Sequence, residues 1–450
     1  MSGVDTRTDV DAAPAEIAPQ APETLVAAGL SVDLIVQLLL KSLHMSGDLR
    51  GVDLAERLGL SFPALSPAFD QLKAQQLTEV VGASALGPPS YVYRITQAGR
   101  ERAIMFLESN KYTGVAPVPL EQYQRYMAAV RARSGHVLTR REVEQAFAHL
   151  VMTQAMLDQI GPAVSAGHSL FVYGPPGNGK TMLSQAIRDL LVGDLYVPHA
   201  IEVGGSIVQV FDPVTHTPLP APVSSLLVES ARTDRRWVRC RRPLVMVGGE
   251  LTLEGLDLSY NPISGFYRAP IQLVANGGVL VVDDFGRQQC SPQALLNRWI
   301  TPLESRVDFL MLQSGQKFDI PFMVLLVLAT NVRPAELVDE AFLRRIRYKV
   351  HAEGPSRTDF ARIFENCCRD LEIPYDPAHV AHLLDDVYPP RKIVPRGCHP
   401  RDLIKHALEL ARYLEQPRRV TVPLLDAACS SYFVDAKAAD DGYGPAVVTR

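Results

Sequence analysis

The sequence has few cysteines, no long apolar run and no excess of charge of either sign. Six cysteines in 450 residues are too sparse for a disulfide framework, and no C-x-x-C pair occurs among them. No stretch offers the roughly 18 uninterrupted apolar residues that a typical membrane-spanning helix needs. The first residues also lack the basic-then-apolar order of a signal peptide. These absences predict a cytoplasmic protein with no membrane partner.

Lysine and arginine together number 45 and aspartate and glutamate 49, which gives a formal net charge of −4. This near-neutral balance excludes a wholly basic nucleic-acid coat and a strongly acidic disordered chain. With 47% hydrophobic residues, the composition is that of a globular protein. At about 150 residues per domain, the length predicts two or three domains.

Composition and periodicity divide the chain into six segments. The ends, 1–24 and 436–450, predict disordered tails, because neither has a hydrophobic period. A capping box at 139–142 predicts a helix that continues to about residue 160. Between the tails we expect a small module at 25–105, a linker at 106–136, an α/β core at 137–350 and a helical region at 351–435.

The small module combines three expected helices with a hairpin. The helices cover about 32–43, 52–58 and 62–76, and two alternating strands at 79–81 and 91–95 flank a Gly- and Pro-containing tip. This order resembles a winged helix-turn-helix. The module carries seven basic and seven acidic residues. Phosphate contacts dominate affinity for DNA, so a module without net positive charge binds DNA weakly unless its charges segregate to one face. Docking to a protein is therefore the alternative to DNA binding.

The strongest motif is a glycine-rich loop between an expected strand and an expected helix. The apolar run SLFVY at 169–173 leads into GPPGNGKT, which matches G-x-x-x-x-G-K-[ST], and a helical pattern follows. Glycines let backbone N–H groups turn toward phosphate oxygens at the start of that helix. We expect Lys180 to reach the β- and γ-phosphates of ATP and Thr181 to bind Mg²⁺. The predicted nucleotide-binding residues of the loop are Gly174, Pro175, Pro176, Gly177, Asn178, Gly179, Lys180, Thr181 and Met182.

Two further apolar runs end in polar residues that suit a nucleotide site. The run GVLVV at 278–282 precedes Asp283, a candidate magnesium ligand, and Asp284, a candidate general base for the attacking water. The run at 324–329 ends before Asn331, whose amide could orient a water or the γ-phosphate. A turn-capping asparagine is the alternative at that position.

This ordered series resembles the AAA+ ATPases over about residues 137–430. The resemblance implies an α/β P-loop core with a parallel sheet, a C-terminal helical lid, and ATP and Mg²⁺ as cofactors. It implies sensor 1 at Asn331 and sensor 2 at Arg401. It places the arginine finger for a neighbouring subunit's γ-phosphate at Arg345, with Arg344 as the next candidate. An arginine finger that one subunit supplies to its neighbour's site implies a homo-oligomeric ring, usually a hexamer.

Other stretches narrow the resemblance. A helix at 291–304 and a hairpin at 307–320, just before the strand of Asn331, resemble the MoxR-type and related groups. The loop at 260–267 would then lie near the ring axis, where other members grip a partner, and the alternative is an insertion packed on its own subunit. The family's usual Asp-Glu pair is Asp283-Asp284 here. Asp is one methylene shorter than Glu, so the carboxylate of Asp284 lies about 1.5 Å further from the attacking water. Weaker positioning of that water predicts slow hydrolysis.

A local cluster of arginines, RTDRRWVRCRR at 232–242, is the best candidate for nucleic-acid contact. In a strand, Trp237, Arg239 and Arg241 would share one face, which suits a nucleic-acid backbone and its bases. Solubilising charge or ion pairs between subunits are the alternatives.

The combined prediction is an ATP hydrolase of the AAA+ type that remodels an unknown protein partner or a nucleic acid. The alternative is an ATP-gated DNA-binding regulator in which nucleotide occupancy switches assembly and hydrolysis is slow or incidental.

Overall fold

The central sheet holds five strands that all run in the same direction. Their order is β10, β13, β16, β5 and β17. In that order they cover Leu244–Val247, Val279–Val282, Leu325–Thr330, Leu170–Tyr173 and Tyr348–His351. Every residue of β13 and β16 is buried, as expected for parallel strands covered on both faces. The predicted α/β fold with a parallel sheet is confirmed.

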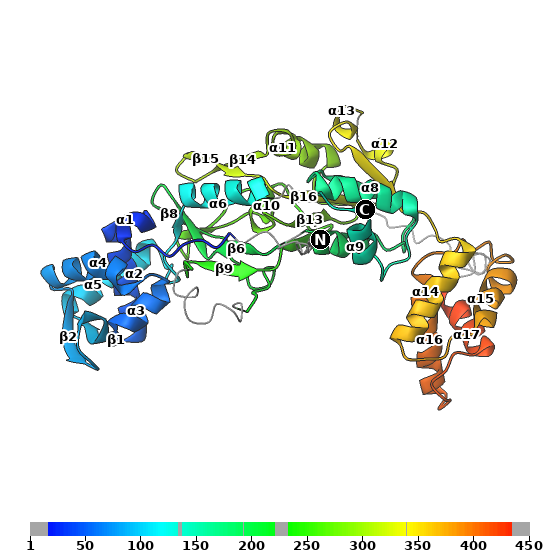
Figure 1. Ribbon diagram of the computed structural model, residues 1–450, viewed down its shortest axis with the longest axis horizontal. Coiled ribbons are helices and arrows are strands. Elements are labelled where there is room, and N and C mark those ends of the chain that lie inside the picture. Colours follow the sequence, from blue (N-terminus) through cyan, green and yellow to red (C-terminus); the bar gives the residue numbers. More distant parts are fainter. Residues whose placement is uncertain (1–16, 134–136, 192, 221–232, 339, 434–450) are drawn as a thin grey trace, which may run out of the picture.

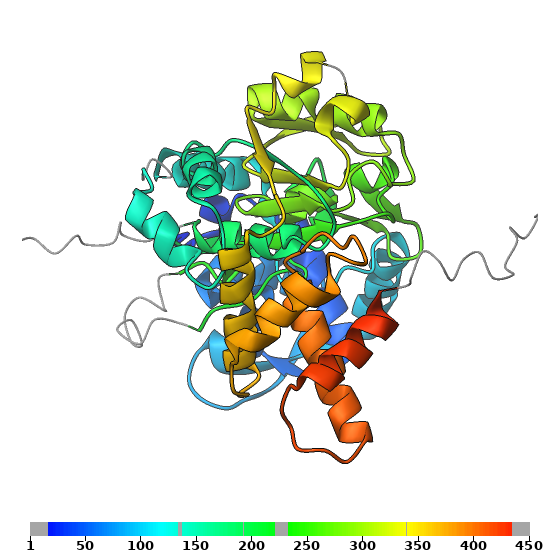
Figure 2. The ribbon, with the colours of Figure 1, turned by 90° about the vertical axis from the view of Figure 1, so that its right-hand side faces the viewer.

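The computed structural model describes residues 17–133, 137–191, 193–220, 233–338 and 340–433. The predicted tail at 436–450 and most of the one at 1–24 therefore lie outside the described residues. Figure 1 shows the first helices at one end of the long axis, the sheets in the middle and the last helices at the other end. Figure 2 looks along that axis. None of the helices in the described ranges combines the length and apolarity that crossing a bilayer requires.

Helices cover both faces of the central sheet. Val279 and Val281 of β13 pack with α8 (Gln154–Ser165) and α9 (Lys180–Asp189). The alternate residues, Leu280 and Val282, pack with α11 (Pro292–Ser305) on the other face. This follows from the two-residue period of a strand, which sends successive side chains to opposite faces.

The helix expected from 140 to about 160 is divided in two. Its capping box is present, and Thr139 caps α7 (Arg140–Ala146). The helix ends there because Phe147, only 1% exposed, enters the core under the sheet. A second cap at Thr153 then starts α8. The prediction of one continuous helix was wrong because tertiary packing overrode the local pattern.

A second sheet, which the sequence patterns did not predict, stands beside the first. Its order is β11, β12, β8, β7 and β4. In that order the strands cover Ser259–Asn261, Phe266–Arg268, Ser206–Gln209, Ala200–Val203 and Val118–Pro119. The expected linker thus contributes a strand, and it continues into α6 (Leu120–Arg133).

The loop at 260–267 belongs to this second sheet. It connects β11 to β12, and β12 pairs with β8 of the same chain. Its tip lies against the end of the N-terminal unit, where the Lys111 amide donates to the Ser264 carbonyl at 2.7 Å. The loop is therefore packed on its own subunit, and a position near a ring axis stays a prediction.

The N-terminal unit contains the three helices and the hairpin expected for 25–105, together with α1, β1 and α5. Its helices are α1 (Leu25–Ala28), α2 (Val32–Ser46), α3 (Gly51–Leu58), α4 (Phe62–Ala74) and α5 (Gln97–Ser109). Its small sheet has the order β1, β3, β2, in which β1 is Leu49–Arg50, β3 is Tyr91–Ile95 and β2 is Thr78–Ala83. Two of its arginines are paired with acids, Arg50 with Asp53 and Arg94 with Asp48. These pairs reduce the positive charge that the unit offers to a phosphate backbone.

The C-terminal residues form a helical unit with its own core. It consists of α14 (Arg357–Asp370), α15 (Pro377–Ala381), a π-helical turn at His382–Val387, α16 (His399–Tyr413) and α17 (Val422–Tyr432). Phe360, Phe364 and Leu425 are fully buried there. Figure 1 places these helices at the end of the molecule away from the N-terminal unit.

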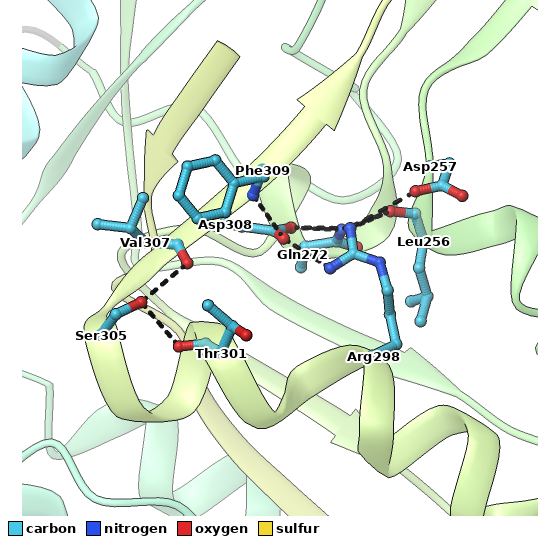
Figure 3. A network of polar contacts seen from close by, with 9 residues as sticks. All are labelled: Leu256, Asp257, Gln272, Arg298, Thr301, Ser305, Val307, Asp308 and Phe309. Atoms are coloured by element: carbon cyan, nitrogen blue, oxygen red, sulfur yellow. Dashed lines mark hydrogen bonds and ion pairs between the residues drawn. The ribbon is translucent and has the colours of Figure 1, made fainter. Parts of the chain in front are cut away.

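The expected hairpin before β16 is present as β14 (Val307–Met311) and β15 (Lys317–Pro321). A buried polar network, drawn in Figure 3, holds it against α11. Arg298 of α11 donates to Asp308 at 2.6 Å, and Gln272 donates to the same carboxylate at 2.9 Å. Asp308 is 1% exposed, so these donors compensate a buried charge.

The arginine cluster at 232–242 is largely internal. Arg236 is 1% exposed and paired with Asp234 at 2.8 Å. In β9 (Trp237–Cys240), which pairs with β6 (Leu195–Pro198), the Trp237 ring packs 4.8 Å from that of Tyr126. Trp237 is therefore not available to stack on a base, and the predicted nucleic-acid face was wrong in this respect. Arg232 lies outside the described residues.

The other described arginines of the cluster divide into two kinds. Arg239 pairs with Asp194 at 2.5 Å, and Arg242 donates to the carbonyls of Gly193 and Gly277. Arg235 and Arg241 are exposed. The positive charge that reaches the surface here is smaller than the sequence suggests.

Arg236 joins three parts of the chain that are distant in sequence. Its guanidinium donates to the Ala28 carbonyl of the N-terminal unit, and to the Pro117 carbonyl and the Gln122 side chain of the linker. Asp234 supplies the counter-charge, and the Asp234 amide donates to the Pro19 carbonyl. This buried ion pair therefore connects the N-terminal unit and the linker to the segment that leads into β9.

We expect Arg236→Met to lower the free energy of unfolding by about 3–5 kcal/mol, because it leaves the Asp234 carboxylate buried without its partner. Urea unfolding followed by tryptophan fluorescence measures this, since Trp237 lies beside the pair. Arg94→Met breaks an exposed pair and is the matched control, which should leave the urea midpoint nearly unchanged. Equal losses in the two variants would contradict the structural role of Arg236.

Candidate nucleotide-binding site

The glycine-rich loop lies where the order of strands reverses. It follows β5, which has β16 on one side and β17 on the other. Ligands of open parallel sheets bind at the carboxyl ends of the strands at such a point. The loop starts at Gly174, whose φ of +144° suits glycine, and an added Cβ would lie 2.4 Å from the Ala352 carbonyl oxygen. It ends at Gly179, after which α9 begins with Lys180.

Lys180, the first residue of α9, extends its side chain back to the loop and is 8% exposed. Its ammonium donates to the carbonyls of Gly174 at 3.0 Å and Pro175 at 3.1 Å, and to Asn331 Oδ1 at 2.7 Å. Burial lowers the pKa of Lys180, and the charges of Asp283 and Asp284 act in the opposite direction. The lysine is thus positioned and partly desolvated before any ligand binds.

The ends of β13 and β16 bring the other predicted side chains to the same place. Thr181 Oγ1 donates to Asp283 Oδ2 at 3.3 Å. Asn331 Nδ2 donates to Asp284 Oδ1 at 2.9 Å. Asn331 therefore bridges Lys180 and Asp284, and the structure brings together the five polar side chains predicted for the centre of the site: Lys180, Thr181, Asp283, Asp284 and Asn331.

Asp284 has an unusual backbone. Its φ is +47°, in the left-handed region that non-glycine residues seldom adopt and that aspartate and asparagine tolerate best. Contacts on both sides hold the turn: before it, the Asp283 amide donates to the Val247 carbonyl at 2.8 Å, and after it, the Phe285 amide donates to the Ala329 carbonyl at 2.7 Å. Such strain persists only where its surroundings fix it.

The C-terminal helical unit touches the loop through a contact that sequence reasoning missed. The Gly397 amide donates to Asn178 Oδ1 at 3.1 Å, and the Cys398 amide donates to the Gly177 carbonyl at 2.8 Å. Asn178 also donates to the Ala352 carbonyl at 3.1 Å. The only sequence signal was the GCHPR run before α16, which gave no indication of the partner.

The remaining predicted residues lie around or away from this centre. Pro175 and Pro176 are exposed on the loop, and Met182 is 44% exposed on α9. Arg401, in the first turn of α16, is exposed and pairs with Asp402 at 3.1 Å.

Arg344 and Arg345 follow α13 (Glu340–Leu343), and Arg345 pairs with Glu304 of α11 at 2.5 Å. Both precede β17, whose start at Tyr348 pairs with the start of β5 at Leu170, whereas the loop follows the other end of β5. The chain therefore does not bring these two arginines to its own loop.

Family models match two parts of the chain. The model described as "Magnesium chelatase, subunit ChlI" matches residues 150–218, which include the whole glycine-rich loop. A domain of unknown function, DUF8689, matches residues 356–431, the helical unit. Magnesium chelatase subunit ChlI is of the AAA+ type. The chain is similar to AAA+ ATPases. The likeness to magnesium chelatase is confined to residues 150–218.

Comparisons with other proteins add little. No curated protein matches the chain. The Holliday junction branch migration motor RuvB of Thermotoga maritima is 12% identical, with a TM-score of 0.36 over 65% of this chain and 70% of RuvB. NtrX from Brucella abortus in complex with ADP is 15% identical, with a TM-score of 0.39 over 74% of this chain and 66% of NtrX. These values are too low to support a conclusion about this chain.

We expect Gly177→Ala to separate the loop from the helical unit. An added Cβ would lie 2.5 Å from the Cys398 sulfur, and the φ of +84° would strain the new side chain. Gly179→Ala has a similar φ of +75° but no neighbour within 4 Å, so it controls for backbone strain alone. Hydrogen exchange at 396–402 should increase in the first variant and stay near wild type in the second. Equal protection in both variants would contradict this contact.

Proposed function

We propose that this chain is an AAA+ ATPase that binds and hydrolyses Mg-ATP at the interfaces of a homo-oligomeric ring, a hexamer by analogy with the family, and thereby remodels a protein or nucleic-acid partner. The observation that carries the proposal is the convergence of Lys180, Asn331 and Asp284 in one hydrogen-bonded set beside the Thr181–Asp283 pair. Lysine, asparagine and two carboxylates beside a glycine-rich turn are the groups that triphosphate chemistry requires.

The described residues fit a triphosphate with its metal. All three ammonium hydrogens of Lys180 have acceptors in the free protein, namely two carbonyls and Asn331 Oδ1. Phosphate oxygens would replace some of these acceptors. Thr181 and Asp283 offer two of the oxygen ligands that Mg²⁺ prefers, and phosphate would supply others. Bound magnesium would neutralise charge on the phosphates.

The chain's own residues would then divide the work. Lys180 would offset negative charge on the phosphates, and the turn at Asp284 would hold its carboxylate where it can accept a proton from water. Asn331 would orient that carboxylate through the bond they already share. Arg401, in the helix that follows the Gly397 contact, would bind the nucleotide and so couple its presence to the position of the helical unit. Arg345, with Arg344 as second choice, would act on the neighbouring subunit's nucleotide.

The modules outside the nucleotide site would bind or act on the partner. We infer that the N-terminal unit is a winged helix-turn-helix and that the β14–β15 hairpin is of the MoxR-related type. Docking to a protein suits the N-terminal unit better than DNA binding, because Arg50 and Arg94 are already paired with acids. The C-terminal helices would form the lid.

We expect Lys180→Ala to abolish Mg-ATP binding, and Asp284→Asn to keep it while slowing phosphate release by about a hundredfold, as loss of a general base does. Asparagine tolerates the left-handed backbone at 284, so the fold should survive. Calorimetric binding and steady-state phosphate release measure the two effects. Asp70→Asn, the same exchange at an exposed site on α4, is the control.

Two outcomes would count against this function. Unchanged turnover in Asp284→Asn would remove the general base from the proposal. Tight ATP binding by the wild type without phosphate release, with or without DNA, would favour the ATP-gated DNA-binding regulator instead.

We expect Arg345→Ala and Asp284→Asn chains, each strongly slowed alone, to recover activity when mixed in equal amounts. In a ring with head-to-tail interfaces, about one quarter of the sites would combine an intact Asp284 with an intact neighbouring Arg345. Glu304→Gln removes the same intramolecular ion pair but keeps Arg345, so it controls for loss of that pair. Absence of recovery in rings that contain both chains would contradict a finger given in trans.

A further inference from the structure

A cavity lies at the edge of the central sheet opposite the glycine-rich loop. Its volume is about 510 Å³, within the range of small-molecule sites. Gly278 and Leu325, next to the starts of β13 and β16, form part of its wall, and Gly167 closes it before β5. Residues from α6 border the other side. The cavity thus lies between the linker and the sheet and shares no lining residue with the nucleotide site.

The charged groups of this cavity are mostly cationic. Four arginines and one acid line it: Arg131, Arg133, Arg242, Arg306 and Asp194. Asp194 already pairs at 2.5 Å with Arg239, which is not part of the lining. Asp194 is therefore already engaged by an arginine outside the lining.

Arg131 and Arg306 are the two lining arginines that could hold an anion. In the ranges that the structure describes, neither guanidinium forms an ion pair with a carboxylate. Arg306 donates to the Gly167 carbonyl at 2.7 Å, which engages one of its five N–H groups. Burial, and then the charge of Arg131, lower the pKa of Arg306. Arg131 is exposed and Arg306 is half-buried, and an anion between the two guanidinium groups would offset their mutual repulsion.

The backbone at Arg306 supports a specific role. It ends α11 with a φ of +60°, a left-handed conformation that arginine rarely adopts. This conformation sets the side chain between α11 and the start of β14, where it reaches Gly167. Left-handed residues also follow α4, α14 and α16, at Gln76, Glu372 and Glu415, so this is a common helix end that here fixes the direction of the Arg306 side chain.

Apolar side chains form the rest of the wall. They include Val130, Leu138, Val164, Leu190 and Phe322. The geometry points to a binding site for a small organic anion, in which Arg131 and Arg306 hold a carboxylate, sulfonate or phosphate group and the apolar wall covers an aromatic or aliphatic body. Guanidinium forks are suited to such planar or tetrahedral anions.

The probe for this site is 8-anilinonaphthalene-1-sulfonate, with neutral N-phenyl-1-naphthylamine as its uncharged analogue. Fluorescence titration of the full chain should show saturable binding of the sulfonate. Arg131→Gln should weaken it about tenfold, as loss of a charge-assisted contact does, while binding of the neutral analogue changes little. Arg141→Gln, an exposed arginine of α7 outside the cavity, is the matched control and should bind like wild type.

Three outcomes would overturn the site. These are unchanged sulfonate affinity in Arg131→Gln, an equal loss for the neutral analogue, and displacement of the sulfonate by saturating Mg-ADP. Arg306→Gln provides a second variant, with its thermal midpoint measured in parallel because the bond to Gly167 is also lost. Since Lys180→Ala leaves this cavity intact, probe binding in that variant separates failure of this site from failure of the nucleotide site.

Discussion

Five strands that run in one direction bring their carboxyl ends to one edge of the central sheet, and the nucleotide site depends on this arrangement. The loop after β5, the acids after β13 and the asparagine after β16 are more than a hundred residues apart at their extremes, yet Lys180, Asn331 and Asp284 are joined by hydrogen bonds of 2.7 and 2.9 Å. Each side chain orients the next. The chemistry therefore rests on the register of the parallel strands.

The rest of the molecule extends from this sheet in two directions. On one side, the inserted strands and the linker connect it to the N-terminal unit, and the buried Arg236–Asp234 pair closes that connection. On the other side, Gly397 and Cys398 tie the C-terminal helices to the glycine-rich loop itself. A ligand at the loop would thus act directly on the helical unit, whereas an anion in the opposite cavity would contact the linker first.

The arginines show how tertiary context changes the meaning of a charge. In the sequence, the cluster at 232–242 has the composition of a nucleic-acid patch. In the fold, Arg236 pairs with Asp234 and Arg239 with Asp194, and Arg242 donates to the Gly277 carbonyl. Arg131 and Arg306, which no motif distinguished, instead converge on a cavity. Desolvation and the positions of the counter-charges decided both outcomes.

The sequence by itself determined the elements whose signals are local. The apolar runs before Gly174 and Asp283 specified buried parallel strands, the Thr139 capping box specified a helix start, and the glycines before Lys180 specified a loop between a strand and a helix. Only the tertiary structure decided where α7 ends, how the strands at 195–268 pair, that Asn178 meets Gly397, and which arginines are buried. These features depend on contacts between residues far apart in the chain, and a local pattern carries no information about such partners.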